Sequence, residues 1–155
     1  MALFLSTYTN KLDKKGRVSV PALFRAALVH PDFNGVVVFR SPQHAALEAM
    51  DMGRMAMISA TLDNFDLFSE TRDDITAALF ADACQLTFDA EGRILLPQAL
   101  LAHAQITDQV TFAGRGPTFQ IWNPEAFLAY QEQARARLKT VMPALKLTQL
   151  SEGGR

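Results

Sequence analysis

The sequence contains one cysteine and no long apolar run, and both absences limit what the protein can be. A single cysteine cannot form an internal disulfide, which fits a reducing compartment such as the cytoplasm. No stretch reaches the ~18 consecutive apolar residues of a transmembrane helix. The N-terminal segment also lacks the basic start, apolar stretch and cleavage site of a secretory signal. We therefore expect a cytoplasmic protein with no membrane partner.

Catalytic and metal-binding motifs are absent as well. The three histidines, His30, His44 and His103, do not fall into an HxH or HExxH spacing. The sequence has neither a nucleophile elbow nor a glycine-rich loop for phosphate. Cys84 falls in a strand-like stretch, where a half-buried structural residue is the default. We expect no enzymatic activity, no cofactor, no metal and no small-molecule substrate.

The distribution of charge is more informative than the net charge of −1. Residues 1–25 carry five basic residues and one acidic residue, whereas residues 26–80 carry three basic and eight acidic ones. Residues 81–155 balance at seven of each. A basic N-terminal turn therefore precedes an acidic or neutral body. Charge alone also fits an ordinary solvated turn.

The sequence contains an internal repeat. LDKKGRVSVPALFR (12–25) and FDAEGRILLPQALL (88–101) share an Asp-x-x-Gly-Arg turn, an apolar strand, a proline and a short helix-like run. Equivalent residues lie 76 apart: Asp13/Asp89, Gly16/Gly92, Arg17/Arg93 and Pro21/Pro97. A fixed internal spacing identifies repeated structural units. Each proline suits the first position of a short helix.

The repeat continues into later strands at a spacing of 74. VVVF (36–39) matches VTFA (110–113), and the difference of two residues falls in a loop. Residues from His44 onward look helical by propensity, but residues 45–49 align with the strand-like segment 119–123. We therefore predict a short strand over 45–50 and a helix from about Asp51.

These patterns predict an α+β chain in which the two repeats share one small β-barrel. Four short strands per repeat are too few to close a barrel alone. We divide the sequence into a first repeat over 1–60, an acidic linker with a helix over 61–79, a second repeat over 80–140, and a loosely ordered tail over 141–155.

The repeated turn has two physical interpretations. Asp at a turn start accepts backbone N–H bonds, and Gly supplies a positive φ, so Asp and Arg could simply brace a hairpin as an ion pair. Alternatively, Arg17 and Arg93 at the mouths of their strands could contact DNA, with Lys14 and Lys15 facing phosphate. Arg can bind guanine through two donors, while Lys acts as a point charge.

The two motifs, together with the start MALFLSTYTNKLD and the helix start WNPEAF, resemble the MraZ family over roughly residues 1–140. The resemblance implies two tandem AbrB-like (swapped-hairpin) repeats. It also implies a nucleoid-associated regulator that binds direct repeats of double-stranded DNA upstream of its own cell-division and cell-wall operon. Repression of that operon and assembly into a ring-shaped homo-oligomer are the family expectations.

The family's functional positions map onto both turns. The resemblance implies DNA contacts from Arg17 and Arg93, supported by the turn residues Lys14 and Lys15. It implies an architectural role for the remaining motif residues Asp13, Gly16, Asp89 and Gly92. The second turn departs from a basic pattern, because Ala90 and Glu91 replace the two lysines. Arg93 could therefore contact DNA or lie at an interface between repeats or subunits.

Two other functions remain open from the sequence. An oligomeric adaptor that never binds DNA could use the acidic middle of the chain, and Met52, Met55 and Met57 fit a core or subunit interface. An AbrB-type antitoxin shares the turn, but two repeats in one chain argue against it. Arg25 fits a salt bridge or a phosphate contact. A steep fall of affinity with salt would indicate DNA binding.

Overall fold

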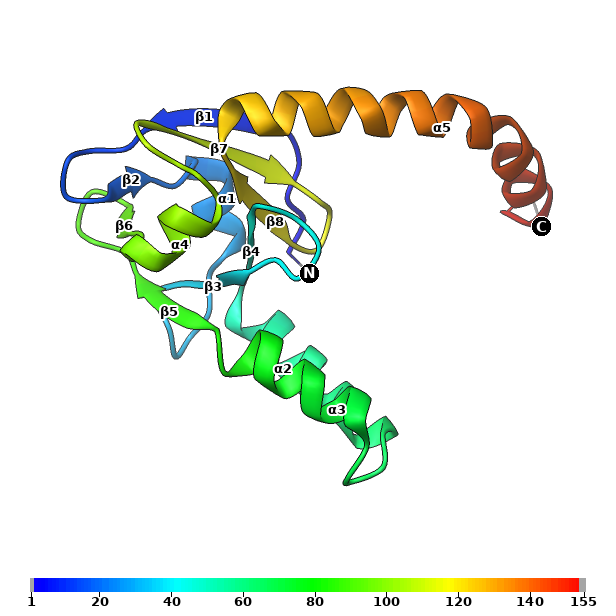
Figure 1. The fold of residues 1–155 in the computed structure, drawn as a ribbon, viewed down its shortest axis with the longest axis horizontal. Coiled ribbons are helices and arrows are strands. Elements are labelled where there is room, and N and C mark those ends of the chain that lie inside the picture. The colour runs from blue at the N-terminus through cyan, green and yellow to red at the C-terminus, as the bar shows by residue number, and fades with distance from the viewer. Residues whose placement is uncertain (1, 154–155) are drawn as a thin grey trace. The chain divides into compact units, whose positions relative to one another are not determined.

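The computed structural model describes residues 2–153, with side chains described through Met142. One compact unit ends at Asn123, and a second begins at Pro124. The first repeat comprises β1 (Thr7–Lys11), β2 (Arg17–Ser19), α1 (Ala22–Ala27), β3 (Gly35–Arg40), β4 (Leu47–Met50) and α2 (Met52–Thr61). The second comprises β5 (Cys84–Thr87), β6 (Arg93–Leu95), α4 (Gln98–His103), β7 (Gln109–Gly114), β8 (Phe119–Trp122) and α5 (Pro124–Gly153). The architecture is α+β, as predicted (Figure 1).

The two repeats share both sheets. A six-stranded antiparallel sheet has the order β1-β7-β8-β4-β3-β5, and β2 pairs with β6 in a separate two-stranded ribbon. When each strand is replaced by its equivalent in the other repeat (β1 by β5, β3 by β7, β4 by β8), the same strand order is obtained in the reverse direction. The predicted spacings appear directly in the pairing, because Val18 faces Ile94 and Leu47 faces Ile121. The sequence repeat is therefore also a structural repeat.

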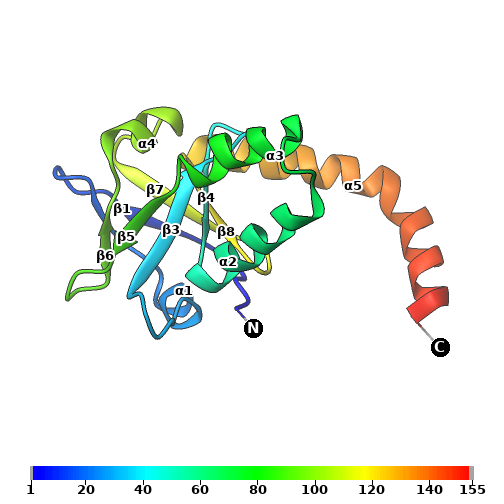
Figure 2. The ribbon, with the colours of Figure 1, turned by 90° about the horizontal axis from the view of Figure 1, so that it is seen from below.

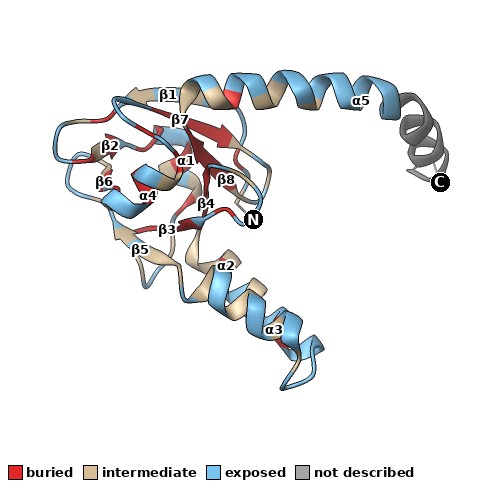
Figure 3. Cartoon of the chain, in the orientation of Figure 1, coloured by how far each residue is buried: buried red, intermediate tan, exposed pale blue. Residues whose placement is uncertain are grey.

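The main core lies between the large sheet, the ribbon and the two short helices. Its largest fully buried aromatic side chains are Phe4, Phe24, Phe112 and Phe119. Phe24 of α1 packs edge-on against Phe4 at 5.3 Å between ring centroids. Figure 3 shows the buried residues concentrated in the strands, with the outer sides of α1 and α4 exposed. One core thus serves both repeats.

The predicted change from strand to helix near residue 50 is confirmed. β4 ends at Met50, and α2 begins at Met52 with Asp51 as its N-cap, whose side chain accepts the Arg54 N–H. Met55 of α2 is buried in a second small cluster with Val37, Phe39 and Met50 on the other face of the sheet. Met57 is exposed.

A helical arm connects the repeats. α2 leads into a 3₁₀ turn, η1 (Leu62–Asn64), and the chain returns through α3 (Glu70–Ile75) and a π-helical turn, η2 (Thr76–Phe80). Ser69 caps α3 through the Arg72 N–H. The arm extends away from the sheet in both ribbon views (Figures 1 and 2). Phe68 at its tip is 94% exposed.

The unit from Pro124 onward is the helix α5, which begins at the Asn-Pro sequence as predicted. Within it, Phe127 and Tyr130 contact each other at 6.4 Å between ring centroids. The sequence predicts a loosely ordered tail over residues 141–155. Within this range the structure describes side chains only for residues 141 and 142, and it does not describe residues 154 and 155. That tail stays a prediction.

Two local expectations were wrong. The strands on either side of the Asp-x-x-Gly-Arg turn do not form a hairpin with each other, because β1 pairs with β7 and β2 pairs with β6. In the ribbon, this pairing between repeats brings the buried side chains of Val18 and Ile94 opposite each other. Pro21 and Pro97 are the N-caps of α1 and α4, with extended backbone, and the helices begin one residue later.

Candidate nucleic-acid interface

The β2–β6 ribbon carries both repeated turns. Val18 and Ile94 face each other at its centre, and each is only 1% exposed because both side chains enter the main core. Val20 donates its N–H to the Gly92 carbonyl, and Leu96 donates to the Gly16 carbonyl. These two bonds extend the ribbon to the turns. The core therefore anchors one face of the ribbon and leaves the other face outward.

The outward face of the ribbon carries both motif arginines. Strand alternation sends the neighbours of a buried pair to the opposite face. Arg17 consequently lies opposite Leu95, and Ser19 lies opposite Arg93. The two arginines stand diagonally across adjacent strands, with their turns at opposite ends of the ribbon. The fold thus brings together two residues that lie 76 apart in the sequence.

In the first turn, the Asp13 carboxylate organises the backbone and the arginine. One oxygen accepts the Lys15 and Arg17 N–H groups at 2.9 and 2.8 Å, and the other accepts Nε of Arg17 at 2.7 Å. The backbone bond from Arg17 is the main cause that lowers the pKa of Asp13 below its ordinary value, while desolvation opposes the shift. Gly16 completes the turn at φ +88°, where a side chain would be strained.

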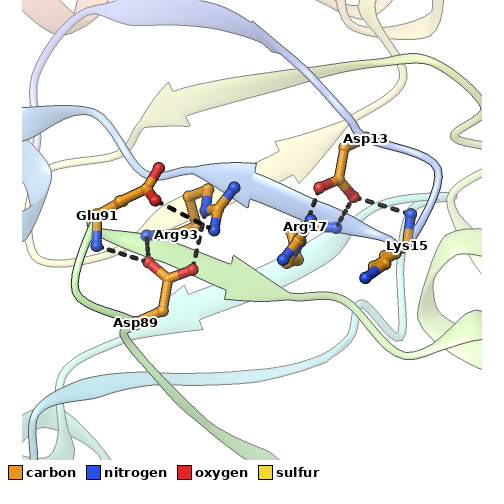
Figure 4. A network of polar contacts seen from close by, with 6 residues as sticks. All are labelled: Asp13, Lys15, Arg17, Asp89, Glu91 and Arg93. Carbon is orange, nitrogen blue, oxygen red and sulfur yellow. Dashed lines mark hydrogen bonds and ion pairs between the residues drawn. The ribbon is translucent and has the colours of Figure 1, made fainter.

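The second turn repeats this geometry. Asp89 accepts the N–H groups of Glu91 and Arg93, both at 2.9 Å, and Nε of Arg93 at 2.8 Å. Gly92 has φ +76°. The hydrogen bond from Arg93 to Asp89 raises the pKa of the Arg93 guanidinium, and the backbone bond from Arg93 lowers the pKa of Asp89. Both turns therefore hold an arginine by its Nε edge (Figure 4).

The charges around the two arginines differ. Lys14 and Lys15 in the first turn are exposed. In the second turn, Glu91 lies 3.7 Å from Nη2 of Arg93, so this guanidinium faces two carboxylates (Figure 4). In the described part of the chain, the guanidinium of Arg17 has a hydrogen bond only through Nε. Arg17 thus keeps its outer edge for a ligand, whereas Arg93 is partly neutralised.

Sequence reasoning missed the group beneath the second turn. The Arg25 guanidinium lies against Gly92, so a Cβ built on Gly92 would be 2.7 Å from Arg25 Cζ. Arg25 also donates through Nη1 to the Val20 carbonyl. The equivalent position in the second repeat is Leu101, which lies near Gly16 of the first turn. The sequence signal for this contact was that Arg25, a charged residue, occupies the position at which the second repeat has the apolar Leu101.

Of the histidine and cysteine positions singled out in the sequence, His103 lies in a helix and Cys84 lies in a strand. His103, the last residue of α4, contacts the His44 carbonyl through Nε2 at 3.0 Å. Cys84 is free and half-buried in β5, as expected for a strand residue. In the part of the chain that the structure describes, no group of three His, Cys, Asp or Glu residues could hold a metal, and no helix is long and apolar enough to cross a membrane.

Comparison with known proteins identifies the family. The chain is 45% identical to "Transcriptional regulator MraZ" of Gluconacetobacter diazotrophicus, and the match covers 99% of this chain and 98% of the relative. The chain belongs to the MraZ family. It is 46% identical to the regulator of the same name from Gluconobacter oxydans, over 91% of this chain and 88% of the relative. With that of Pelagibacter ubique it shares 43% identity over 93% of each.

The family profile gives the same result for the second repeat. The profile described as "MraZ protein, putative antitoxin-like" matches residues 79–147. The MraZ resemblance predicted from the two motifs is therefore confirmed. The relatives carry the name of a regulator and not of an enzyme, in agreement with the prediction of a non-enzymatic protein.

Proposed function

We propose that this MraZ-family chain is a transcription regulator that binds double-stranded DNA through the outward face of the β2–β6 ribbon. The protein is cytoplasmic and nucleoid-associated. It binds direct repeats upstream of its own cell-division and cell-wall operon and represses that operon. The chain acts as a ring-shaped homo-oligomer of subunits built from two AbrB-like, swapped-hairpin repeats around a small barrel. The names of the relatives support the regulatory role.

The observation that carries this proposal is the pair of arginines on one exposed ribbon face. A two-stranded β-ribbon fits the DNA major groove, which is about 12 Å wide. Arg17 and Arg93 lie on the solvent side of such a ribbon, while Val18 and Ile94 anchor its other side in the core. This arrangement presents charged side chains from a rigid support.

The aspartates prepare the arginines for recognition. Each carboxylate fixes the Nε edge of its arginine and does not bond to the terminal nitrogens, although Nη2 of Arg93 lies 3.7 Å from Glu91. An arginine held in this way loses less side-chain entropy on binding a guanine edge or a phosphate. Asp13 and Asp89 therefore act as positioning residues, and Gly16 and Gly92 provide the turn conformation.

The difference in charge assigns unequal roles to the turns. In the first turn, Lys14 and Lys15 attract phosphate while Arg17 reads a base or contacts the backbone. In the second turn, Glu91 repels phosphate, so Arg93 makes the weaker DNA contact. A single chain offers few phosphate contacts. A ring would present several such ribbons to regularly spaced repeats at high effective concentration.

Fluorescence anisotropy with DNA from upstream of the protein's own gene tests the proposal. Wild type, Arg17→Ala and Arg93→Ala are titrated across a range of salt concentrations. We expect Arg17→Ala to lose most specific binding while keeping its oligomeric state, with a smaller loss for Arg93→Ala. Wild type without preference for its own upstream DNA at any salt concentration would favour an oligomeric adaptor instead.

A further inference from the structure

A cavity of about 540 Å³ lies directly beside the first turn, and the proposed DNA contacts do not account for it. Its walls come from both repeats, with Leu12 to Gly16 on one side and the segment from Leu95 to Gln98 on another. Leu101, Ile106 and Thr107 complete the lining. The volume falls in the range of small-molecule sites, roughly 300–1,000 Å³.

The lining combines an apolar floor with a cationic rim. Leu12, Leu96, Leu101 and Ile106 are buried residues of the lining, at 7% exposure or less. Lys14 and Lys15 are exposed at the rim. A phosphate of the DNA backbone needs no apolar floor. The arrangement instead matches a ligand that has an apolar body and a negatively charged head.

The only acidic residue in the lining does not cancel the charge of the rim. The carboxylate of Asp13 already accepts two backbone N–H groups and Nε of Arg17. Asp13 and Arg17 therefore satisfy each other, and the two lysines remain to attract an anion. Gln98 adds a polar side chain to the lining.

The second turn offers an internal comparison. Its cavity, of about 380 Å³, is lined by Arg25 together with Asp89, Glu91 and their neighbours. Arg25 stands where the first cavity has Leu101, and the second turn carries Ala90 and Glu91 where the first carries Lys14 and Lys15. At the second turn an amphipathic anion would meet the carboxylate of Glu91 in place of a lysine, and the polar guanidinium of Arg25 in place of the apolar Leu101 side chain. The same fold thus forms a site suited to such a ligand at one turn only.

We propose that the cavity beside the first turn binds a small amphipathic anion, an acid head on an apolar body. The head lies at Lys14 and Lys15, and the body lies on the floor formed by Leu101 and Ile106. The ligand consequently competes with DNA phosphate for the two lysines. The ligand site stands independently, whereas this competition rests on the proposed DNA-binding function.

The binding test uses 8-anilinonaphthalene-1-sulfonate, a fluorescent amphipathic anion, with decanoate as competitor. Thr107→Trp narrows the cavity from its exposed rim. Asn34→Trp, at the cavity of the second turn, is the matched control. Circular dichroism verifies that each variant is folded.

We expect saturable dye binding that decanoate displaces, at least tenfold weaker in Thr107→Trp and unchanged in Asn34→Trp. Saturating decanoate should weaken DNA binding of wild type several-fold without affecting Thr107→Trp. Equal dye binding by wild type and Thr107→Trp would overturn the site. DNA affinity insensitive to decanoate would overturn the competition. A wild type that binds no DNA would refute the proposed function, while the dye titration would still decide the ligand site.

Discussion

Val18 and Ile94 face each other at the point where the two repeats meet in the β2–β6 ribbon, and each side chain is 1% exposed. This pair holds the arginine-bearing strands against the core. Since Arg17 and Arg93 occupy the opposite face of the same strands, the position of the proposed recognition surface depends on this apolar contact. Substitutions of neighbouring residues can therefore test the two faces separately: Val18 and Ile94 for the core, and Arg17 and Arg93 for the proposed recognition surface.

Ile94→Ala should lower the free energy of unfolding by about 2–5 kcal/mol, because it removes buried methylene groups and leaves a cavity. Leu95→Ala is the matched control, since the next side chain along the strand is 56% exposed. We expect that change to stay within about 0.5 kcal/mol. Denaturant unfolding followed by circular dichroism measures both, and equal losses would contradict the assigned faces of the ribbon.

The two turn aspartates should make stability depend on acid pH. Their folded pKa values lie below the ordinary value of 3.8, so the stabilisation is fully present above that pH and is lost as the pH falls through the folded values. Unfolding measured from pH 6 to pH 2 should show this loss in wild type. The double variant Asp13→Asn/Asp89→Asn should lack this part of the decline. The same decline in both proteins would argue against ion pairing in the turns.

The salt dependence of DNA binding should follow the charge of each turn. Lys14→Ala should reduce the slope of log affinity against log salt by about 0.9, the value for one phosphate contact. Glu91→Lys should strengthen binding and steepen the slope, because it replaces a repulsive charge in the second turn. Anisotropy titrations at several salt concentrations give both slopes. Unchanged affinity for Glu91→Lys would place the second turn away from DNA.

The ion pair between Arg40 and Asp82 should stabilise the junction between the arm and β5. Asp82 accepts the Arg40 backbone N–H at 2.8 Å and its Nε at 3.0 Å. Asp82→Ala should cost about 1–2 kcal/mol, since it leaves the Arg40 backbone N–H without its partner and removes the ion pair. A double-mutant cycle with Arg40→Ala measures the coupling by thermal unfolding. Additive losses would show that the pair contributes nothing beyond its separate residues.

The repeat made much of the fold predictable. Local propensity favours a helix from His44, but the alignment with the second repeat predicts the strand that the structure contains. Tertiary context overrides propensity there, because β4 lies between β3 and β8 in the sheet. Asp51 then marks the helix start by its capping side chain, which is a local signal that sequence alone carries.

Other parts depend on contacts that no local pattern encodes. The strands flanking each turn look like a hairpin in sequence, yet each pairs with a strand from the other repeat. Arg25 beneath Gly92 is a contact across 67 positions, so the sequence indicated only its charge and not its place. The sequence showed that Glu91 replaces a lysine of the first turn, but it did not predict the ion pair between Glu91 and Arg93.

The exchange of strands between repeats has a consequence for how the chain folds during synthesis. Thr7 of β1 pairs with Ala113 of β7. The first strand to leave the ribosome therefore cannot pair until β7, the second-to-last strand, has been synthesised. The β3–β4 pair can form early from neighbouring segments, but the ribbon needs residues on both sides of the arm. Such distant pairings slow folding and leave strand edges exposed meanwhile. A nascent chain interrupted within the second repeat would therefore expose the very edges that the finished protein joins.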